Sequence, residues 1–389
     1  MKAYDGGQDG EEWPPPRQNP DLQGHEEAEL ALHEAFSSGR LPHAWLIAGR
    51  RGIGKATLAH RFARFVLANG GDGAGGLFAG ELPVEGPVDG SVDGSGPLYL
   101  SPHNPVFRRT AAAGHADLIT VERSLNDKGK LRTEIVVDDV RQIGSFLGLT
   151  SAEGGWRVVI IDCADEMNRH GANAVLKVLE EPPPRALLLL VSHAPGRLLA
   201  TIRSRCRRLQ LKPLAENEVA GLVREYLPDL TAGEIGELAG LAEGSIGRAL
   251  GLAKEGGVEL YRDLMAILNT LNTMGGLDVS ALHSMGDRVG GIGAGDTFHT
   301  VSELLTRWLG RLVMFAAHRR FDPGGGGGAG FGEDDGELMA RLAQAGGLDC
   351  WLGVWEKVTR LLARTDSVNL DRKQVFIGSI LALENAVRS

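Results

Sequence analysis

Short apolar runs alternate with amphipathic segments over the first half of the chain. The apolar runs are nearly continuous, which is typical of strands that are covered on both faces of a parallel sheet. They lie at residues 44–48, 117–121, 158–161 and 187–191. The segments between them carry apolar residues at three- and four-residue spacing, which predicts helices at 25–37, 56–68, 138–147 and 168–179. This alternation predicts an α/β domain with a parallel sheet.

The pattern changes after Pro213, where strand-like runs stop and helical spacing continues. Glycine gathers in two segments of low periodicity, and this composition is typical of flexible insertions. The resulting prediction is a disordered tail at 1–24, an α/β domain at 25–212 with a flexible insertion at 69–96, a small helical domain at 213–255, and a helical domain at 256–389 with a flexible loop at 323–336.

Composition and charge narrow the class of protein. The chain has 389 residues, enough for two or three domains, and a net charge of −9, which argues against a general nucleic-acid coat. No apolar run reaches the roughly 20 residues of a membrane span, and the polar start has no signal-peptide core. Three widely spaced cysteines argue against a disulfide framework. We therefore expect a cytoplasmic protein without a membrane partner.

The strongest local motif follows the first apolar run. Gly49, Gly52 and Gly54 precede Lys55 at the start of a helical pattern, which is the context of a phosphate-binding loop. Glycines let successive backbone N–H groups surround phosphate oxygens, and the lysine adds positive charge. The alternative is a glycine-rich turn with an incidental lysine.

At two positions near this motif, the residues differ from those that a hydrolytic enzyme needs. The residue after the lysine usually supplies a hydroxyl to Mg²⁺, but here it is Ala56, and Thr57 is turned away by about 100° on a helix. Asp162 ends the run 158–161 and could support Mg²⁺ through water, or it could simply cap the next turn. Cys163 follows it where a second carboxylate would activate water, and a thiol is a poor base for that purpose. The sequence predicts weak metal coordination and no hydrolysis.

Three further motifs and the loop at 49–57 occur in order along the chain: Leu-Pro-His at 41–43, the loop, Leu-Lys-Val-Leu-Glu-Glu-Pro-Pro at 176–183 and Ser-Arg-Cys at 204–206. This series resembles the clamp-loader branch of the AAA+ ATPases. The resemblance covers residues 25–213 well and the helical remainder only in outline. It implies an AAA+ P-loop domain with a parallel sheet, a small helical lid and a C-terminal all-α collar domain.

The resemblance also implies roles for single residues. Arg205 corresponds to an arginine that reaches ATP held by a neighbouring subunit, although it could also be one of several solvated arginines at a strand end. Ser192 is either a phosphate-sensing residue or an ordinary strand-end hydroxyl. Gly247 stands where active relatives carry a sensing arginine, with Arg248 one place later. The four cysteines of the family's zinc module are absent from residues 69–109, so we expect no zinc.

Together these features favour a hydrolysis-deficient clamp-loader subunit that supplies Arg205 in trans and helps load a sliding clamp on primed DNA. The implied ligand is ATP or ADP with weak Mg²⁺, and the implied partners are gamma/tau subunits, a delta subunit, the sliding clamp and, through the complex, primed DNA. One alternative is an active motor ATPase of the gamma/tau type. Another is a different AAA+ module such as a helicase loader.

Overall fold

The structure is a computed structural model of the whole chain. It describes residues 13–71, 96–127, 129–271, 273, 276–291, 293–321, 333–365 and 368–388. The chain divides into two compact units, one formed by residues 2–230 and 242–248 and the other mainly by 231–241 and 249–389. In the described ranges, no helix is both long and apolar enough to cross a membrane.

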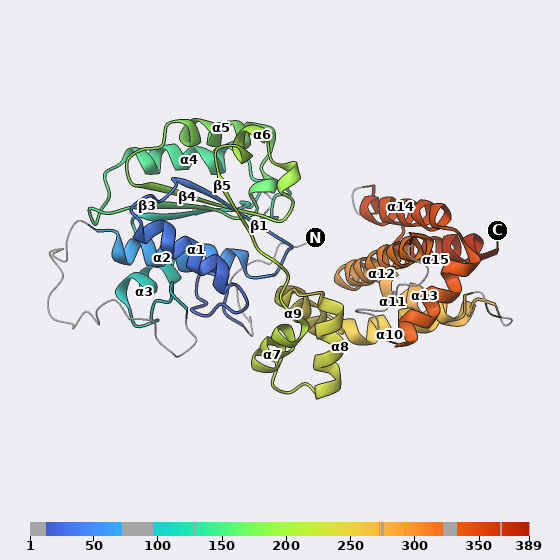
Figure 1. Cartoon of the computed structure of the whole chain (residues 1–389). Helices are drawn as coiled ribbons and strands as arrows, with labels where there is room; N and C mark the ends of the chain where they lie inside the picture. The colour runs from blue at the N-terminus through green and yellow to red at the C-terminus, as the bar shows by residue number, and fades with distance from the viewer. Residues whose placement is uncertain are drawn as a thin grey trace. The chain divides into compact units, whose positions relative to one another are not determined.

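The first unit is built on a sheet of five parallel strands in the order β2-β3-β4-β1-β5 (Figure 1). The strands are β1 Ala44–Ala48, β2 Leu118–Val121, β3 Arg157–Ile161, β4 Ala186–Ser192 and β5 Arg207–Gln210. Every residue of β1 and β4 is buried, which agrees with their continuous apolar sequences. β5 forms one edge of the sheet and pairs with β1 from Trp45–Arg207 to Ala48–Gln210.

Helices cover both faces of this sheet (Figure 1). One face packs against α1 Glu26–Ser37 and α2 Lys55–Asn69, with α3 Pro105–Ala111 beside α2. The other face packs against α4 Val137–Gly148, α5 Arg169–Glu180 and the short α6 Ala200–Arg203. Two apolar cores result, one on each side of the sheet, as expected for a parallel sheet whose strands are apolar on both faces.

A buried ion pair joins the first two helices. Arg61 Nε of α2 lies 2.7 Å from Glu29 Oε1 of α1, and the two side chains are 2% and 3% exposed. Arg61 also donates to the carbonyl of Pro20, and Arg64 donates to the carbonyls of Arg17 and Asn19. Residues 13–24 are thus held along α2 by buried arginines, whereas the sequence suggested a disordered tail up to residue 24; residues 1–12 of that tail lie outside the described residues.

After the sheet, the described part of the chain is helical. α7 Glu216–Tyr226 belongs to the first unit, and residues 242–248 return to it. α8 Ala232–Ala242 and α9 Ile246–Lys254 lead into the second unit. Its helices are α10 Gly257–Asn269, α11 Val279–Gly290, α12 Gly295–Phe321, α13 Glu333–Ala345, α14 Leu348–Arg364 and α15 Arg372–Arg388. Trp308 and Trp351 lie in their core, which agrees with the helical packing expected for this region.

The predicted fold class, an α/β domain with a parallel sheet followed by helices, is confirmed. Three elements of the sheet domain were absent from the expectation, α3, α6 and β5, because none of them contains a long apolar pattern. The insertion predicted at 69–96 falls mostly on residues 72–95, and the loop predicted at 323–336 falls mostly on 323–332; both ranges lie outside the described residues.

Candidate functional site

The glycine-rich loop connects the end of β1 to the start of α2. It lies at the carboxyl edge of the sheet, the side at which all the parallel strands end; the opposite side, where they begin, is the amino edge. Gly52 and Gly54 have φ angles of +75° and +97°, which side-chain-bearing residues rarely adopt. A Cβ at Gly49 would lie 2.7 Å from Ile53 Cδ1 and 2.9 Å from the Leu211 carbonyl oxygen. The loop therefore needs glycine at all three positions, for backbone conformation or for close packing.

Lys55 is the first residue of α2, and its side chain is buried. Nζ donates to the carbonyl of Arg50 in the same loop. Burial lowers the pKa of Lys55 to about 8, and the negative charge of Asp162 opposes this shift. Ala56 beside it is half-buried and offers no hydroxyl, while Thr57 is buried in the helix.

The segment that begins α9 packs directly on this loop. Ser245 Oγ donates to the Arg51 carbonyl at 2.8 Å, and Gly247 N donates to the Gly52 carbonyl at 2.9 Å. A Cβ on Gly247 would lie 3.0 Å from Gly52 Cα, so a larger side chain needs the two backbones to separate. Arg248 Nη1 lies 3.9 Å from Glu243 Oε2. Backbone-to-backbone packing thus leaves little room for a side chain at position 247.

Asp162 lies at the end of β3, in the neighbourhood of Lys55. Burial raises the pKa of Asp162, while the positive charge of Lys55 acts in the opposite direction. Cys163 Sγ donates a weak hydrogen bond to Asp162 Oδ1 at 3.7 Å. Burial, reinforced by the charges of Asp162 and Glu166, raises the pKa of the Cys163 thiol, so it is neutral near pH 7. A neutral thiol does not accept a proton from water.

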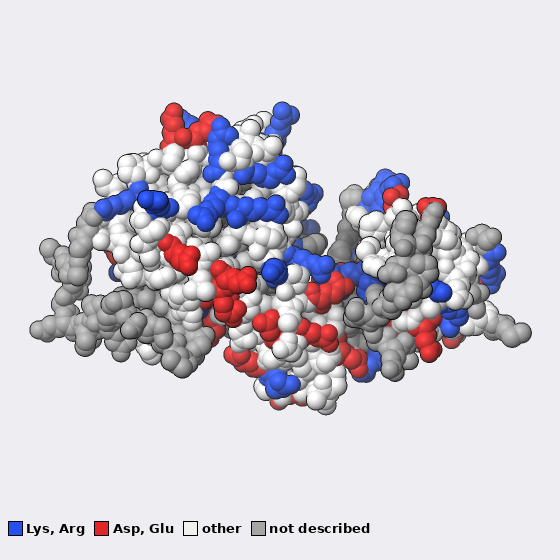
Figure 2. Space-filling view, in the orientation of Figure 1, with Lys and Arg blue, Asp and Glu red and all other residues white. Residues whose placement is uncertain are grey.

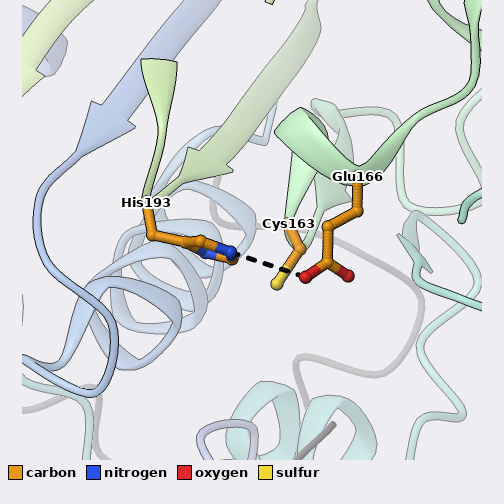
Figure 3. A group of neighbouring side chains, drawn as sticks. All are labelled: Cys163, Glu166 and His193. Atoms are coloured by element: carbon orange, nitrogen blue, oxygen red, sulfur yellow. Dashed lines mark ion pairs between the residues drawn. The ribbon is translucent and has the colours of Figure 1, made fainter. Parts of the chain in front are cut away.

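Ser192 ends β4 beside β3 and is completely buried. Its Oγ has no hydrogen-bond partner within the described ranges. The next residue, His193, turns toward the segment after β3 (Figure 3). Its Nε2 lies 3.4 Å from Asp165 Oδ2 and 3.4 Å from Glu166 Oε1. Burial alone would raise the pKa of Glu166, but the hydrogen bond to His193 and the charge of Arg123 lower it below its ordinary value.

Arg205 lies elsewhere in the unit. It follows α6 and precedes β5, so it stands at the amino edge of the parallel sheet. Its Nη2 lies 2.8 Å from Glu180 Oε1 and its Nη1 donates to the Thr201 carbonyl at 3.1 Å, while 35% of its side chain remains exposed. His43, which precedes β1, reaches the Leu179 carbonyl at 3.2 Å. The three motifs at 41–43, 176–183 and 204–206 therefore meet at one edge of the sheet.

Positive charge gathers around this amino edge and along β5. Lys and Arg side chains are concentrated over α6 and β5 in Figure 2. The exposed members are Arg197, Arg203, Arg207, Arg208 and Lys212. Arg207 lies 4.9 Å above the Trp45 ring, and Arg208 donates to Gln210 Oε1 at 2.7 Å.

The structure thus brings together most residues that the sequence singled out. Gly49, Gly52, Gly54, Lys55, Asp162 and Ser192 lie at the carboxyl edge, and Arg205 lies at the opposite edge. Their functional roles stay predictions. Sequence reasoning missed the cluster of Cys163, Glu166 and His193, because His193 lies far from the other two along the sequence. The available signal was that these residues directly follow two predicted strands, which could be neighbours in a parallel sheet.

Comparison with known proteins matches residues 102–215 to the family model described as "DNA polymerase III, delta subunit". The chain is 36% identical to DNA polymerase III subunit delta′ of Pseudomonas aeruginosa over 205 residues, 52% of this chain and 53% of that protein. The chain resembles DNA polymerase III clamp-loader subunits. This finding confirms the resemblance inferred from the motifs.

The similarity extends to a second subunit type. The chain is 29% identical to the tau subunit of Escherichia coli over 239 residues, 60% of this chain and 32% of that protein. It thus spans about half of the delta′ relative and a third of the tau relative. Among solved structures, a DNA polymerase III gamma subunit-related protein of Thermotoga maritima aligns with 93% of this chain and 100% of its own, at 17% identity and a TM-score of 0.41.

Proposed function

We propose that this chain is a delta′-like subunit of a DNA polymerase III clamp loader, that it hydrolyses no ATP itself, and that it supplies Arg205 to an ATP site on a neighbouring subunit. The similarity that supports this proposal includes a delta′ subunit at 36% identity over 205 residues. The partners proposed are gamma/tau and delta subunits, with the sliding clamp and primed DNA engaged by the assembled complex.

The observation that carries the proposal is the position of Arg205 at the sheet edge opposite its own phosphate-binding loop. β1 and β5 are paired in register from Trp45–Arg207 to Ala48–Gln210. Three steps along a parallel strand cover about 10 Å. Arg205 precedes this stretch and the loop follows it, so the two are separated by more than its length. A guanidinium in this place is suited to the phosphates of another molecule and not to those bound by its own loop.

The surroundings of Arg205 suit such a role. Glu180 and the Thr201 carbonyl fix the guanidinium in direction, while a third of the side chain remains open. An arginine supplied in trans stabilises charge on the transferred phosphoryl group and can raise the rate by about 10³–10⁵. The planar fork can grip two phosphate oxygens, which a lysine cannot do.

Loss of hydrolysis in the chain itself follows from the chemistry at the other edge. Ala56 supplies no hydroxyl for Mg²⁺, and Cys163 carries a neutral thiol where a carboxylate would activate water. The loop glycines, Lys55 and Asp162 are still present to bind a nucleotide. We therefore propose that ATP or ADP is bound through backbone N–H groups and Lys55, with weak Mg²⁺ coordination, once the Ser245–Gly247 contact with the loop opens.

The competing function is a gamma/tau-type motor ATPase, which the similarity to tau subunits favours. The test is to measure ATPase of the isolated chain, then to mix it with candidate gamma/tau and delta subunits and follow co-elution by size-exclusion chromatography. We expect no turnover by the isolated chain and a single complex with the partners. Steady turnover by the pure chain that Lys55→Ala abolishes, and that the exposed control Lys212→Ala preserves, would establish the motor function instead.

A further inference from the structure

Three potential metal ligands converge at the carboxyl ends of β3 and β4. One atom each of Cys163, Glu166 and His193 lies within 4.8 Å of the other two (Figure 3). Cys163 and Glu166 flank the short turn after β3, and His193 directly follows β4. The adjacent parallel strands thus fix all three residues, and their side chains are half-buried.

The spacing of two ligand atoms already matches that of a tetrahedral metal site. His193 Nε2 lies 3.4 Å from Glu166 Oε1. Bonds of about 2.0–2.1 Å from a tetrahedral Zn²⁺ to nitrogen and oxygen place those atoms about 3.3–3.4 Å apart. A Zn–S bond of about 2.3 Å places sulfur about 3.6 Å from each of them. The distance from the Cys163 sulfur to each of these atoms, at most 4.8 Å, therefore needs to shorten by about 1.2 Å or less to complete the set.

Asp165 gives a second, independent indication of a cation at this place. It is 8% exposed, and in the described part of the chain its Oδ2 has no hydrogen-bond partner. That atom lies 3.4 Å from His193 Nε2, while Oδ1 accepts from the His193 backbone N–H at 3.1 Å. Asp165 thus positions His193 through its backbone N–H, and its buried Oδ2 faces the nitrogen that would bind the metal.

Charged groups of both signs surround the cluster. Arg123 Nε contacts Glu166 Oε2 at 3.0 Å, so Oε1 is the oxygen that faces His193. The carboxylates of Asp162, Asp165 and Glu166 lie within five residues of the chain, and the positive charges of Lys55, Arg51 and Arg123 act on the same segment. Glu166 Oε1 and Cys163 Sγ remain the ligand atoms that lie close to His193.

We propose that Cys163, Glu166 and His193 form a binding site for Zn²⁺ or a similar borderline divalent cation, with Asp165 as the residue that positions His193. Sulfur, imidazole nitrogen and carboxylate oxygen are together a zinc donor set, whereas Mg²⁺ avoids sulfur. Three protein ligands leave a fourth position for water. The sequence-based expectation of no zinc rested on the missing four-cysteine module and treated Cys163 as a buried thiol rather than a ligand, whereas this site uses that one cysteine. It does not depend on the clamp-loader function.

The test uses the full chain without an affinity tag, stripped of metal by a chelator and then dialysed against ZnCl₂. We expect about one Zn²⁺ per chain by elemental analysis. Titration with CoCl₂ as the probe should produce a thiolate-to-cobalt charge-transfer absorption, which reports a Co–S bond directly. A chain that retains no Zn²⁺, or that binds Co²⁺ without this absorption, overturns the site.

Variants distinguish this site from other thiols and imidazoles. Cys163→Ser should abolish the charge-transfer band, while Cys350→Ser, which changes a half-buried cysteine in the other unit, should preserve it.

Glu166→Gln should weaken Zn²⁺ binding even if the cysteine variant misfolds, and Asp165→Asn should weaken it by about 10–100-fold, as expected for a residue that orients a ligand. His170→Ala removes an exposed histidine and should have no effect. Equal Zn²⁺ affinity in wild type and Glu166→Gln would contradict the assignment.

Discussion

The two edges of the parallel sheet differ in how they hold their charged groups. At the carboxyl edge, Lys55 is buried and Asp162 is half-buried, and the Ser245–Gly247 segment packs on the loop that carries the lysine. At the amino edge, Arg205 is a third exposed and is paired with a half-exposed Glu180. The first edge encloses its charged groups, whereas the second leaves a guanidinium partly exposed to solvent.

This difference has an energetic consequence. Charges that are buried and paired cost several kcal/mol when one partner is removed, whereas exposed pairs contribute about 0–1 kcal/mol. Substitutions near the carboxyl edge should therefore change the stability of the fold, and substitutions at the amino edge should change function with little effect on stability. The predictions below test that contrast in order of expected size.

The largest effect is expected at the ion pair that supports the helix of the phosphate-binding loop. Arg61→Ala leaves Glu29 buried without its partner, since both side chains are almost fully buried. We expect the free energy of unfolding to fall by roughly 3–5 kcal/mol. Chemical denaturation measures it. Arg141→Ala, which removes an exposed pair with Asp138, is the control and should change stability by less than about 0.5 kcal/mol. Similar losses in both variants would contradict the contrast.

Lys55 should make stability depend on pH. Its pKa is about 8 in the folded chain and 10.5 in its ordinary state, so between these values the unfolded chain binds more protons. Stability should therefore rise as pH increases through this window, by an amount on the order of 3 kcal/mol in total. Denaturation of wild type and Lys55→Met at several pH values isolates the contribution. A difference between the two chains that does not change from pH 8 to 10.5 would refute the buried, depressed lysine.

Gly247 tests the packing of the lid segment on the loop. Gly247→Ala puts a methyl group 3.0 Å from Gly52 Cα, which the backbone must relieve by shifting. We expect a loss of roughly 1–3 kcal/mol. Gly251→Ala, in the same helix but with open space around the new methyl group, should instead stabilise by about 0.5–1 kcal/mol. Thermal unfolding of both variants measures the two signs, and a stabilising Gly247→Ala would mean that the segment does not pack on the loop.

The smallest stability effect is expected at the amino edge. Glu180→Gln removes the charged partner of Arg205, but both side chains reach solvent. The free energy of unfolding should change by less than about 1 kcal/mol. A loss of several kcal/mol would show that this pair holds the fold together and would weaken the view of Arg205 as a residue for a partner.

The sequence predicted the sheet well because its strands are apolar on both faces. The run 44–48 became β1 with the same bounds, and β3 and β4 extend the predicted runs by one or two residues. β5 was missed because its sequence, Arg-Arg-Leu-Gln, is stabilised by pairing with β1 rather than by its own apolar pattern. The apolar pattern of the sequence therefore predicted the buried strands but not the exposed edge strand β5.

The candidate site was predictable where residues are local and hidden where they are not. The glycines and Lys55 form one motif, and Asp162 was found as the end of a strand. The sequence motifs did not show that Gly247 touches Gly52, and the only signal that His193 faces Cys163 and Glu166 was that these residues follow two predicted strands; strand order and packing decide both contacts. The placement of Arg205 opposite its own loop likewise requires the register of β1 and β5.

The most direct test of the account is the ATPase of a reconstituted complex that contains either Arg205→Ala or Arg208→Ala. Both residues belong to the same basic region, but Arg208 is a β5 residue whose guanidinium donates to Gln210 of its own strand. We expect Arg205→Ala to fold and to join the complex. The one affected ATP site should lose the roughly 10³-fold or more in rate that an arginine supplied in trans provides. Total ATPase should fall only in part, because the other ATP sites of the complex keep their activity. Arg205→Lys should not restore it, and Arg208→Ala should retain full activity. Equal losses from Arg205→Ala and Arg208→Ala would show that general positive charge matters and would contradict the assignment of Arg205.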